Sequence, residues 1–94
     1  MMVLKCKMYV LLVYDIKEER VAKVLKVCRQ YLYRIQNSVF EGEITDPNLR
    51  ELKFKLKKII NLDLDSVFIF KMRTKDVFKK EIVGIEEFPI ENIF

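Results

Sequence analysis

The sequence predicts an α+β fold in which strands and helices follow one another in the order β-α-β-β-α-β. Three observations lead to this prediction. Residues 8–15 form an unbroken apolar run that ends at one carboxylate, which is typical of a strand covered on both faces. Residues 17–31 and 47–60 each carry apolar side chains at helical spacing, with charged side chains between them. The chain has 94 residues, which is the size of one domain.

The first strand places Asp15 at its carboxyl end. Because ligands commonly bind beyond the carboxyl ends of strands in α/β proteins, Asp15 is the first candidate for chemistry. A structural alternative stays open, since Asp15 and Glu18 have the spacing of a capping box at the start of the first helix. The apolar run is too short for a membrane span, which needs about 20 apolar residues. We therefore expect a cytoplasmic protein, not bound to a membrane, whose cysteines are reduced and whose Cys28 is a small core residue.

The middle of the chain combines strand formers with a strong helix start. Residues 33–44 predict two strands, or one long strand broken near Asn37 and Ser38, with Gly42 at a bulge or turn. Thr45-Asp46-Pro47 then provides a cap and a proline in the first helical turn, so the second helix is expected over 47–60. Asn61 is expected to end this helix in a left-handed conformation.

The last part of the chain predicts a fourth strand at 67–72 and a short fifth strand at 81–85. Phe68 and Phe70 share one face of the fourth strand, where core packing is the expected role and stacking on RNA bases is the alternative. The complete order is the split βαβ, ferredoxin-like arrangement, with both helices on one face of an antiparallel sheet. The other face must be covered or bind something, because the first strand is apolar on both sides. We therefore expect a homodimer.

Charge and composition restrict the chemistry. The net charge is +4, but residues 46–80 carry ten Lys and Arg against five acids, whereas residues 81–94 carry four Glu and no base. The basic middle suggests a polyanion ligand, although a Lys-coated surface gives the same pattern. The chain has no His, two Cys and two Gly, which excludes Cys/His zinc sites and argues against a phosphate-cradling loop. What remains is carboxylate and metal chemistry, or binding alone.

In the metal-dependent alternative, a two-fold axis near Asp15 would supply two carboxylates to one Mg²⁺ ion, which could activate water towards a phosphodiester. Arg20, Arg29, Arg34 and Arg73 could each grip phosphate, although each could equally be a surface charge.

A longer pattern is more specific. The strand ending at Tyr14-Asp15, Arg20 in the first turn of the helix, and the block Arg34-Ile35-Gln36-Asn37-Ser38-Val39-Phe40-Glu41-Gly42 together resemble the small CRISPR-associated adaptation protein family. This is the smaller of the two core spacer-acquisition proteins, also described as a metal-dependent endoribonuclease. The resemblance extends from Met8 to about Ile85. One departure is Leu32-Tyr33, where family members usually carry a glycine.

The resemblance implies a ferredoxin-like homodimer in which Asp15 of each chain is the catalytic residue and ligates one shared Mg²⁺. It also implies that Tyr14, Arg20, Arg34 and Phe40 bind or orient the nucleic acid, either single-stranded RNA or double-stranded DNA.

The implied partner proteins are CRISPR integrase subunits, between which the dimer would act as an adaptor. A non-catalytic adaptor on duplex DNA, and a ribonuclease toxin from a related family with the same fold and early Asp, are the alternatives. Residues 1–7 are expected to be an N-terminal extension. Residues 8–94 are expected to form a single domain whose C-terminal strand is exchanged to, or paired with, the partner subunit.

Overall fold

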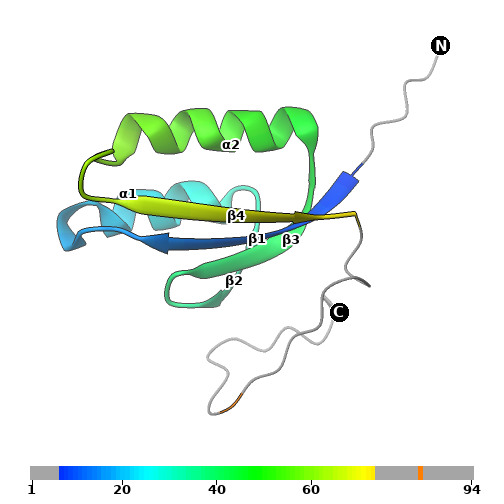
Figure 1. Cartoon of the computed structure of the whole chain (residues 1–94), viewed down its shortest axis with the longest axis horizontal. Coiled ribbons are helices and arrows are strands. Elements are labelled where there is room, and N and C mark those ends of the chain that lie inside the picture. Colours follow the sequence, from blue (N-terminus) through cyan, green and yellow to red (C-terminus); the bar gives the residue numbers. More distant parts are fainter. Residues whose placement is uncertain (1–6, 74–82, 84–94) are drawn as a thin grey trace.

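The computed structural model describes residues 7–73 and Val83 of the chain. It contains six elements, β1 (Lys7–Asp15), α1 (Glu18–Arg29), β2 (Tyr33–Gln36), β3 (Val39–Thr45), α2 (Asp46–Ile59) and β4 (Ser66–Met72). The four strands form one antiparallel sheet in the order β2-β3-β1-β4, with α1 and α2 on the same side (Figure 1). The predicted ferredoxin-like order is confirmed for these elements.

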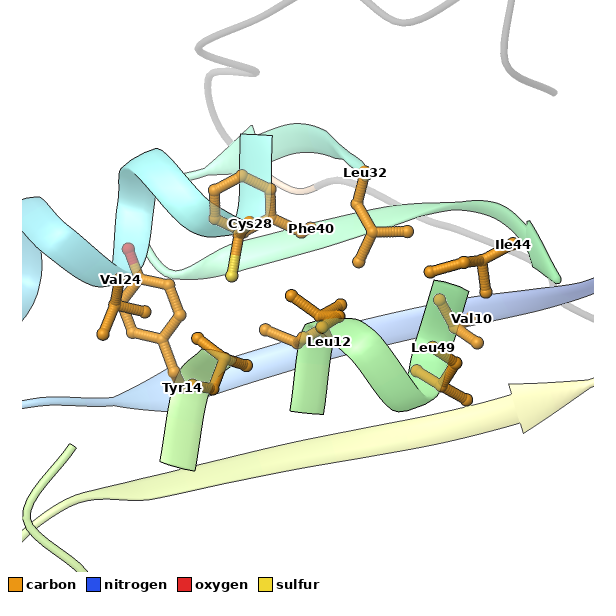
Figure 2. Close-up of a cluster of buried hydrophobic side chains, with 11 residues drawn as sticks. Val10, Leu12, Tyr14, Val24, Cys28, Leu32, Phe40, Ile44 and Leu49 are labelled. Carbon is orange, nitrogen blue, oxygen red and sulfur yellow. The ribbon is translucent and has the colours of Figure 1, made fainter. Parts of the chain in front are cut away.

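The core lies between the helices and one face of the sheet. Alternate residues of β1, namely Val10, Leu12 and Tyr14, point towards the helices and are at most 5% exposed. They belong to one cluster with side chains of both helices and of β3, shown in Figure 2: Val24, Cys28, Phe40, Ile44, Leu49, Leu52 and Leu56. Cys28 is 0% exposed, so its predicted place in the core is confirmed.

Among residues 7–73 and Val83, no helix lies on the opposite face of the sheet, which we call the helix-free face. Leu11 and Val13 of β1 point to this side, and they pair with Phe70 and Phe68 of β4. Each of these two phenylalanines is 54% exposed. The prediction that they pack in the core is therefore wrong for the described chain, because both lie on the helix-free face. β1 is apolar on both sides because one set of its residues lies in the core and the other, Leu11 and Val13, belongs to this exposed apolar face.

The two helices begin differently from each other. Thr45 caps α2 as predicted, because its hydroxyl oxygen accepts a hydrogen bond of 3.3 Å from the Asn48 N–H. The capping box predicted at α1 is wrong, since the N-cap is Lys17 and no side chain of that turn closes a cap bond. The carboxylate of Asp65 instead accepts the Lys17 N–H at 2.9 Å, and it comes from the loop before β4.

Two predictions about backbone conformation are also wrong. Asn61 is not left-handed, because no non-glycine residue in the described ranges has a positive φ, and Ile60 already leaves α2 in an extended conformation. Gly42 is neither in a turn nor at a bulge. It pairs with Val10 inside β3 at a φ of 156°, and the irregularity between β2 and β3 falls at Arg34–Gln36. A Cβ at Gly42 would lie 3.4 Å from the side chain of Leu32.

Three further predictions concern residues that the structure does not describe. The fifth strand at 81–85 and its pairing with a partner subunit lie outside the described residues, apart from Val83, which has no regular structure. Of the predicted extension at residues 1–7, the structure describes Lys7, which begins β1.

Candidate active site

Asp15 is the last residue of β1, the central strand whose neighbours are β3 and β4. Its side chain is exposed, and strand alternation directs it to the helix-free face, on the same side as Leu11 and Val13. Ser66, the first residue of β4, is its pairing partner. The carboxylate therefore stands at one end of an exposed apolar face.

Tyr14 precedes Asp15 and points the other way, into the core, where it is 5% exposed. Its hydroxyl donates a hydrogen bond of 3.2 Å to the main-chain oxygen of Asn37, and its N–H donates one of 3.0 Å to the oxygen of Ser38. These bonds tie the end of β1 to the turn between β2 and β3. Burial raises the pKa of Tyr14, so the hydroxyl keeps its proton at neutral pH.

Phe40 and Arg34 complete a cluster beside that turn. Phe40 is 0% exposed, and its ring is stacked against Tyr14 with the ring centroids 6.1 Å apart. Arg34 pairs with Phe40 across β2 and β3, is half-buried, and donates a hydrogen bond of 3.3 Å from Nη2 to Oδ1 of Asn37. The structure thus brings Tyr14, Arg34 and Phe40 together on the helix side of the sheet, whereas Asp15 faces away from them.

Arg20 does not join this cluster. Its guanidinium binds both oxygens of the Asp65 carboxylate, with Nε at 2.5 Å from Oδ2 and Nη2 at 3.0 Å from Oδ1. Asp65 is 7% exposed, and it also accepts the N–H groups of Lys17 and Asn61. The bonds from Arg20 hold the pKa of Asp65 well below its usual range, and the two backbone bonds add to this effect, so together they outweigh the opposing effect of burial.

Sequence reasoning missed Asp65 and one further polar pair. Asp65 lies 45 positions after Arg20, and a single acid in a loop has no pattern that would indicate its partner. Tyr9 and Glu41 are both buried, and the Tyr9 hydroxyl donates a hydrogen bond to the Glu41 carboxylate. Burial, together with this bond, raises the pKa of Tyr9 far above its usual range. Glu41 belongs to the segment 34–42 that resembles the CRISPR-associated family, but nothing in the sequence indicated that its side chain is buried.

The donors available to a metal ion are limited within one chain. Among residues 7–73 and Val83, no group of three or more His, Cys, Asp or Glu side chains could hold a metal ion. Asp15 offers the hard carboxylate oxygens that Mg²⁺ prefers, and Mg²⁺ commonly keeps several waters and uses one or two carboxylates. Asp15 therefore fits such an ion if a second protein donor comes from another copy of the chain.

Neither of the helices in the described part of the chain has the length and apolar character that a membrane span requires.

The fold and this arrangement define a class of small ferredoxin-like domains in which a central strand ends at an exposed carboxylate, and a buried Tyr, a buried Phe and a half-buried Arg lie on the other face of the sheet. The particular family follows from comparison with known proteins. The sequence model of CRISPR associated protein Cas2 matches residues 8–80, and the chain belongs to this family. The resemblance drawn from residues 14–42 is thereby confirmed.

Individual relatives agree with the family model. The chain is 49% identical over 86 residues to the CRISPR-associated endoribonuclease Cas2 of Pyrococcus furiosus, a match that covers 92% of this chain and 99% of the relative. It is 48% identical over 79 residues to the CRISPR-associated endoribonuclease Cas2 2 of Archaeoglobus fulgidus, covering 84% of this chain and 86% of the relative.

Solved structures share the fold. A crystal structure of a Cas2 protein superposes with a TM-score of 0.83 at 45% identity, covering 90% of this chain and 95% of that one. Cas2 of Streptococcus pyogenes, crystallised at pH 6.5, superposes with a TM-score of 0.71 at 30% identity, covering 81% of this chain and 100% of that one.

Proposed function

We propose that this protein is a homodimeric CRISPR adaptation protein that binds nucleic acid and, with Mg²⁺, hydrolyses phosphodiester bonds of RNA or DNA. The observation that carries the proposal is the position of Asp15, exposed at the end of the central strand and on the helix-free face. The names of its relatives, CRISPR-associated endoribonucleases, support the reaction class.

The dimer is supported by the exposed apolar face. Phe68 and Phe70 are each 54% exposed and lie beside Leu11 and Val13 on the helix-free side of the sheet. A second copy that covers this face removes that apolar surface from water, which is favourable. Because Asp15 points to the same side, a two-fold axis near the end of β1 would bring two Asp15 carboxylates together. The fifth strand at 81–85 would then pair with the sheet of the partner subunit.

The proposed chemistry follows from these positions. Two Asp15 carboxylates would hold one Mg²⁺, which when bound supplies Lewis acidity towards a phosphate oxygen and a water of lowered pKa. Without a cation the same carboxylates would repel each other, so the pair favours a divalent ion. Arg34 lies on the helix side of the sheet, beside the turn between β2 and β3, so it would bind a phosphate away from the one at Asp15. Tyr14 and Phe40 are buried and would hold the end of β1 and this turn in place.

A second function is supported by the outer surface of the helices. Exposed basic side chains, Lys23 and Lys26 on α1 and Lys53, Lys57 and Lys58 on α2, lie away from the proposed dimer face. A dimer with this surface could grip duplex phosphates and bridge integrase subunits without cleaving anything. In that alternative Asp15 shapes the dimer interface.

Cleavage assays on matched variants distinguish these functions. Labelled single-stranded RNA and duplex DNA are incubated with wild type, Asp15→Asn and Asp46→Asn, in Mg²⁺ or in EDTA, and binding is measured on the same samples. Asp46 is an exposed Asp at the start of α2, beside the opposite end of β1, so it controls for loss of one surface charge. We expect Mg²⁺-dependent cleavage by wild type and Asp46→Asn, and the EDTA level of cleavage with Asp15→Asn, while all three proteins bind.

Cleavage that persists in Asp15→Asn, or that is equally low in both variants, would refute Asp15 as the metal ligand. If no protein cleaves either substrate but all bind duplex DNA with strong salt dependence, the adaptor function stands and the nuclease function fails.

A further inference from the structure

The carboxylate of Asp65 is fully used by its neighbours. Oδ1 accepts the Lys17 N–H at 2.9 Å and Nη2 of Arg20 at 3.0 Å, while Oδ2 accepts the Asn61 N–H at 2.8 Å and Nε of Arg20 at 2.5 Å. A carboxylate offers about four acceptor sites, so these four bonds saturate it. The Asp65 side chain itself is 0% exposed, whereas that of Arg20 is 18% exposed. We call this arrangement, made by Arg20 and Asp65 with the N–H groups of Lys17 and Asn61, the clasp.

The clasp joins the two chain segments that flank Asp15. Lys17 lies in the loop between β1 and α1, two residues after Asp15. Asp65 immediately precedes Ser66, the first residue of β4, and Ser66 pairs with Asp15 of β1. Among residues 7–73 and Val83, the Asp15 carboxylate itself forms no hydrogen bond or ion pair. Its position therefore depends on how the backbone on either side is held, and the clasp holds both sides.

The same bonds leave Arg20 poorly suited to grip phosphate. Bidentate binding of a phosphate needs two neighbouring N–H donors of the guanidinium fork. The Nε and Nη2 edge is occupied by Asp65, and Nη1 lies 3.5 Å from the carboxylate of Glu19. The positive charge of Arg20 is thus matched by acids of its own chain.

We infer that Arg20 is a positioning residue, which acts through Asp65 to fix the backbone around Asp15, and that it is not a phosphate ligand. The inference rests on the proposed nuclease function for its effect on cleavage, but its claim about phosphate binding stands apart from cleavage. It assigns Asp65 a positioning role beside Asp15, although the Asp65 side chain is 0% exposed and its acceptor sites are filled by its own chain.

Salt dependence of nucleic-acid binding tests the phosphate claim. Each phosphate contact contributes a slope of about −0.7 for single strands or −0.9 for B-DNA in a plot of log affinity against log salt concentration. We compare wild type with Arg20→Gln and, as a control, Arg29→Gln, which removes an exposed Arg from the last turn of the same helix. We expect the slope of Arg20→Gln to equal that of wild type. A slope that is smaller in magnitude by about 0.7 to 0.9 for Arg20→Gln alone would overturn the inference.

A double-mutant cycle tests the positioning claim. Cleavage is measured for Arg20→Gln, Asp65→Asn and the double variant, with kcat and KM determined separately. If Arg20 acts through Asp65, the Arg20→Gln change lowers kcat in the wild-type background with little effect on KM, and changes kcat less than about two-fold once Asp65 is Asn. If the Arg20→Gln substitution lowers kcat by the same factor in the wild-type and Asp65→Asn backgrounds, the two residues act independently and the inference fails. It also fails if Arg20→Gln raises KM and leaves kcat unchanged.

A second substitution covers the case in which Asp65→Asn does not fold. Arg20→Lys keeps the charge but not the two-pronged geometry that binds both Asp65 oxygens. The inference predicts reduced kcat with an unchanged salt slope for Arg20→Lys, whereas full retention of kcat contradicts it. If wild type itself does not cleave, the proposed nuclease function and the claimed effect on kcat fail together, while the salt slopes still decide whether Arg20 contacts phosphate.

Discussion

Phe40→Ala separates a core role for Phe40 from a ligand-binding role. The family resemblance placed Phe40 among the nucleic-acid residues, but the side chain is 0% exposed and packs on Tyr14. Phe54 provides a matched control, because it is also a phenylalanine but is 59% exposed on α2. The same substitution at both positions therefore compares a fully buried ring with one that lies mostly in water.

The expected magnitude follows from burial. A buried aromatic ring removes about 150–250 Å² from water, and Phe→Ala changes in cores cost about 3–5 kcal/mol. We expect about 4 kcal/mol for Phe40→Ala, which for a domain of this size lowers Tm by about 15–30 °C. Phe54→Ala loses its contact with Lys58, whose ammonium lies 4.3 Å from the ring centroid, and should cost less than about 1 kcal/mol.

The assay is thermal unfolding followed by circular dichroism, at one fixed protein concentration because association raises the apparent Tm. Binding of RNA and duplex DNA is then measured with Phe40→Leu, which keeps the core filled, well below its unfolding transition. We expect binding close to that of wild type. Equal shifts of Tm for Phe40→Ala and Phe54→Ala would refute the burial argument. A Phe40→Leu protein that melts like wild type but no longer binds would show that Phe40 contacts the ligand.

Three further outcomes are expected. Thr45→Ala removes the acceptor for the Asn48 N–H and should lower the free energy of unfolding by about 1 kcal/mol, while Thr45→Ser should restore most of it, as measured by urea denaturation. Cys28 is buried and its pKa is raised to about 12 by that burial, so mass spectrometry should find it unmodified by iodoacetamide at pH 8 in the folded protein and alkylated in denaturant. Because the pKa of Asp65 is lower in the folded chain than in the unfolded one, its ionised form adds stability above the ordinary carboxyl pKa, and this contribution is lost as pH falls through the lowered value. The difference in Tm between wild type and Asp65→Asn should therefore shrink from pH 6 towards pH 2.

Each of these outcomes can be contradicted directly. A Thr45→Ala protein as stable as wild type would show that water replaces the cap. Rapid alkylation of Cys28 in the folded protein would show that the core opens readily. A difference between wild type and Asp65→Asn that stays constant down to pH 2 would mean that the charge of Asp65 does not stabilise the fold.

The sequence predicted those elements whose signals are local. The apolar run of β1, the helical spacing in α1 and α2, and the Thr45 cap each depend on residues within a few positions of one another, and the structure confirms them. The position of Asp15 at the carboxyl end of β1 was also predicted, whereas its role as a metal ligand stays a prediction. Predicting the position required only the order of elements and the strand boundary.

The remaining features depend on contacts between distant parts of the chain. Alternation in β4 shows that Phe68 and Phe70 share a face, but the same alternation results whether that face meets helices or a second subunit. The cap predicted from Asp15 and Glu18 failed because an acid 48 residues after Lys17 supplies the acceptor for its N–H. The pairing of Arg20 with Asp65 was not predicted either, since no local pattern indicates a partner 45 positions away.

The central position of β1 has a consequence for how the chain folds as it is made. β1 leaves the ribosome before both of its neighbours in the sheet, β3 and β4, and β4 ends at Met72. At a translation rate of about 5–20 residues per second, the most apolar strand waits several seconds for its second neighbour. Until then only the hairpin of β2 and β3 and the two helices can form from contacts close in sequence. The described four-stranded sheet is therefore completed only after β4 has emerged, and a nascent chain that stalls before β4 exposes one edge of β1.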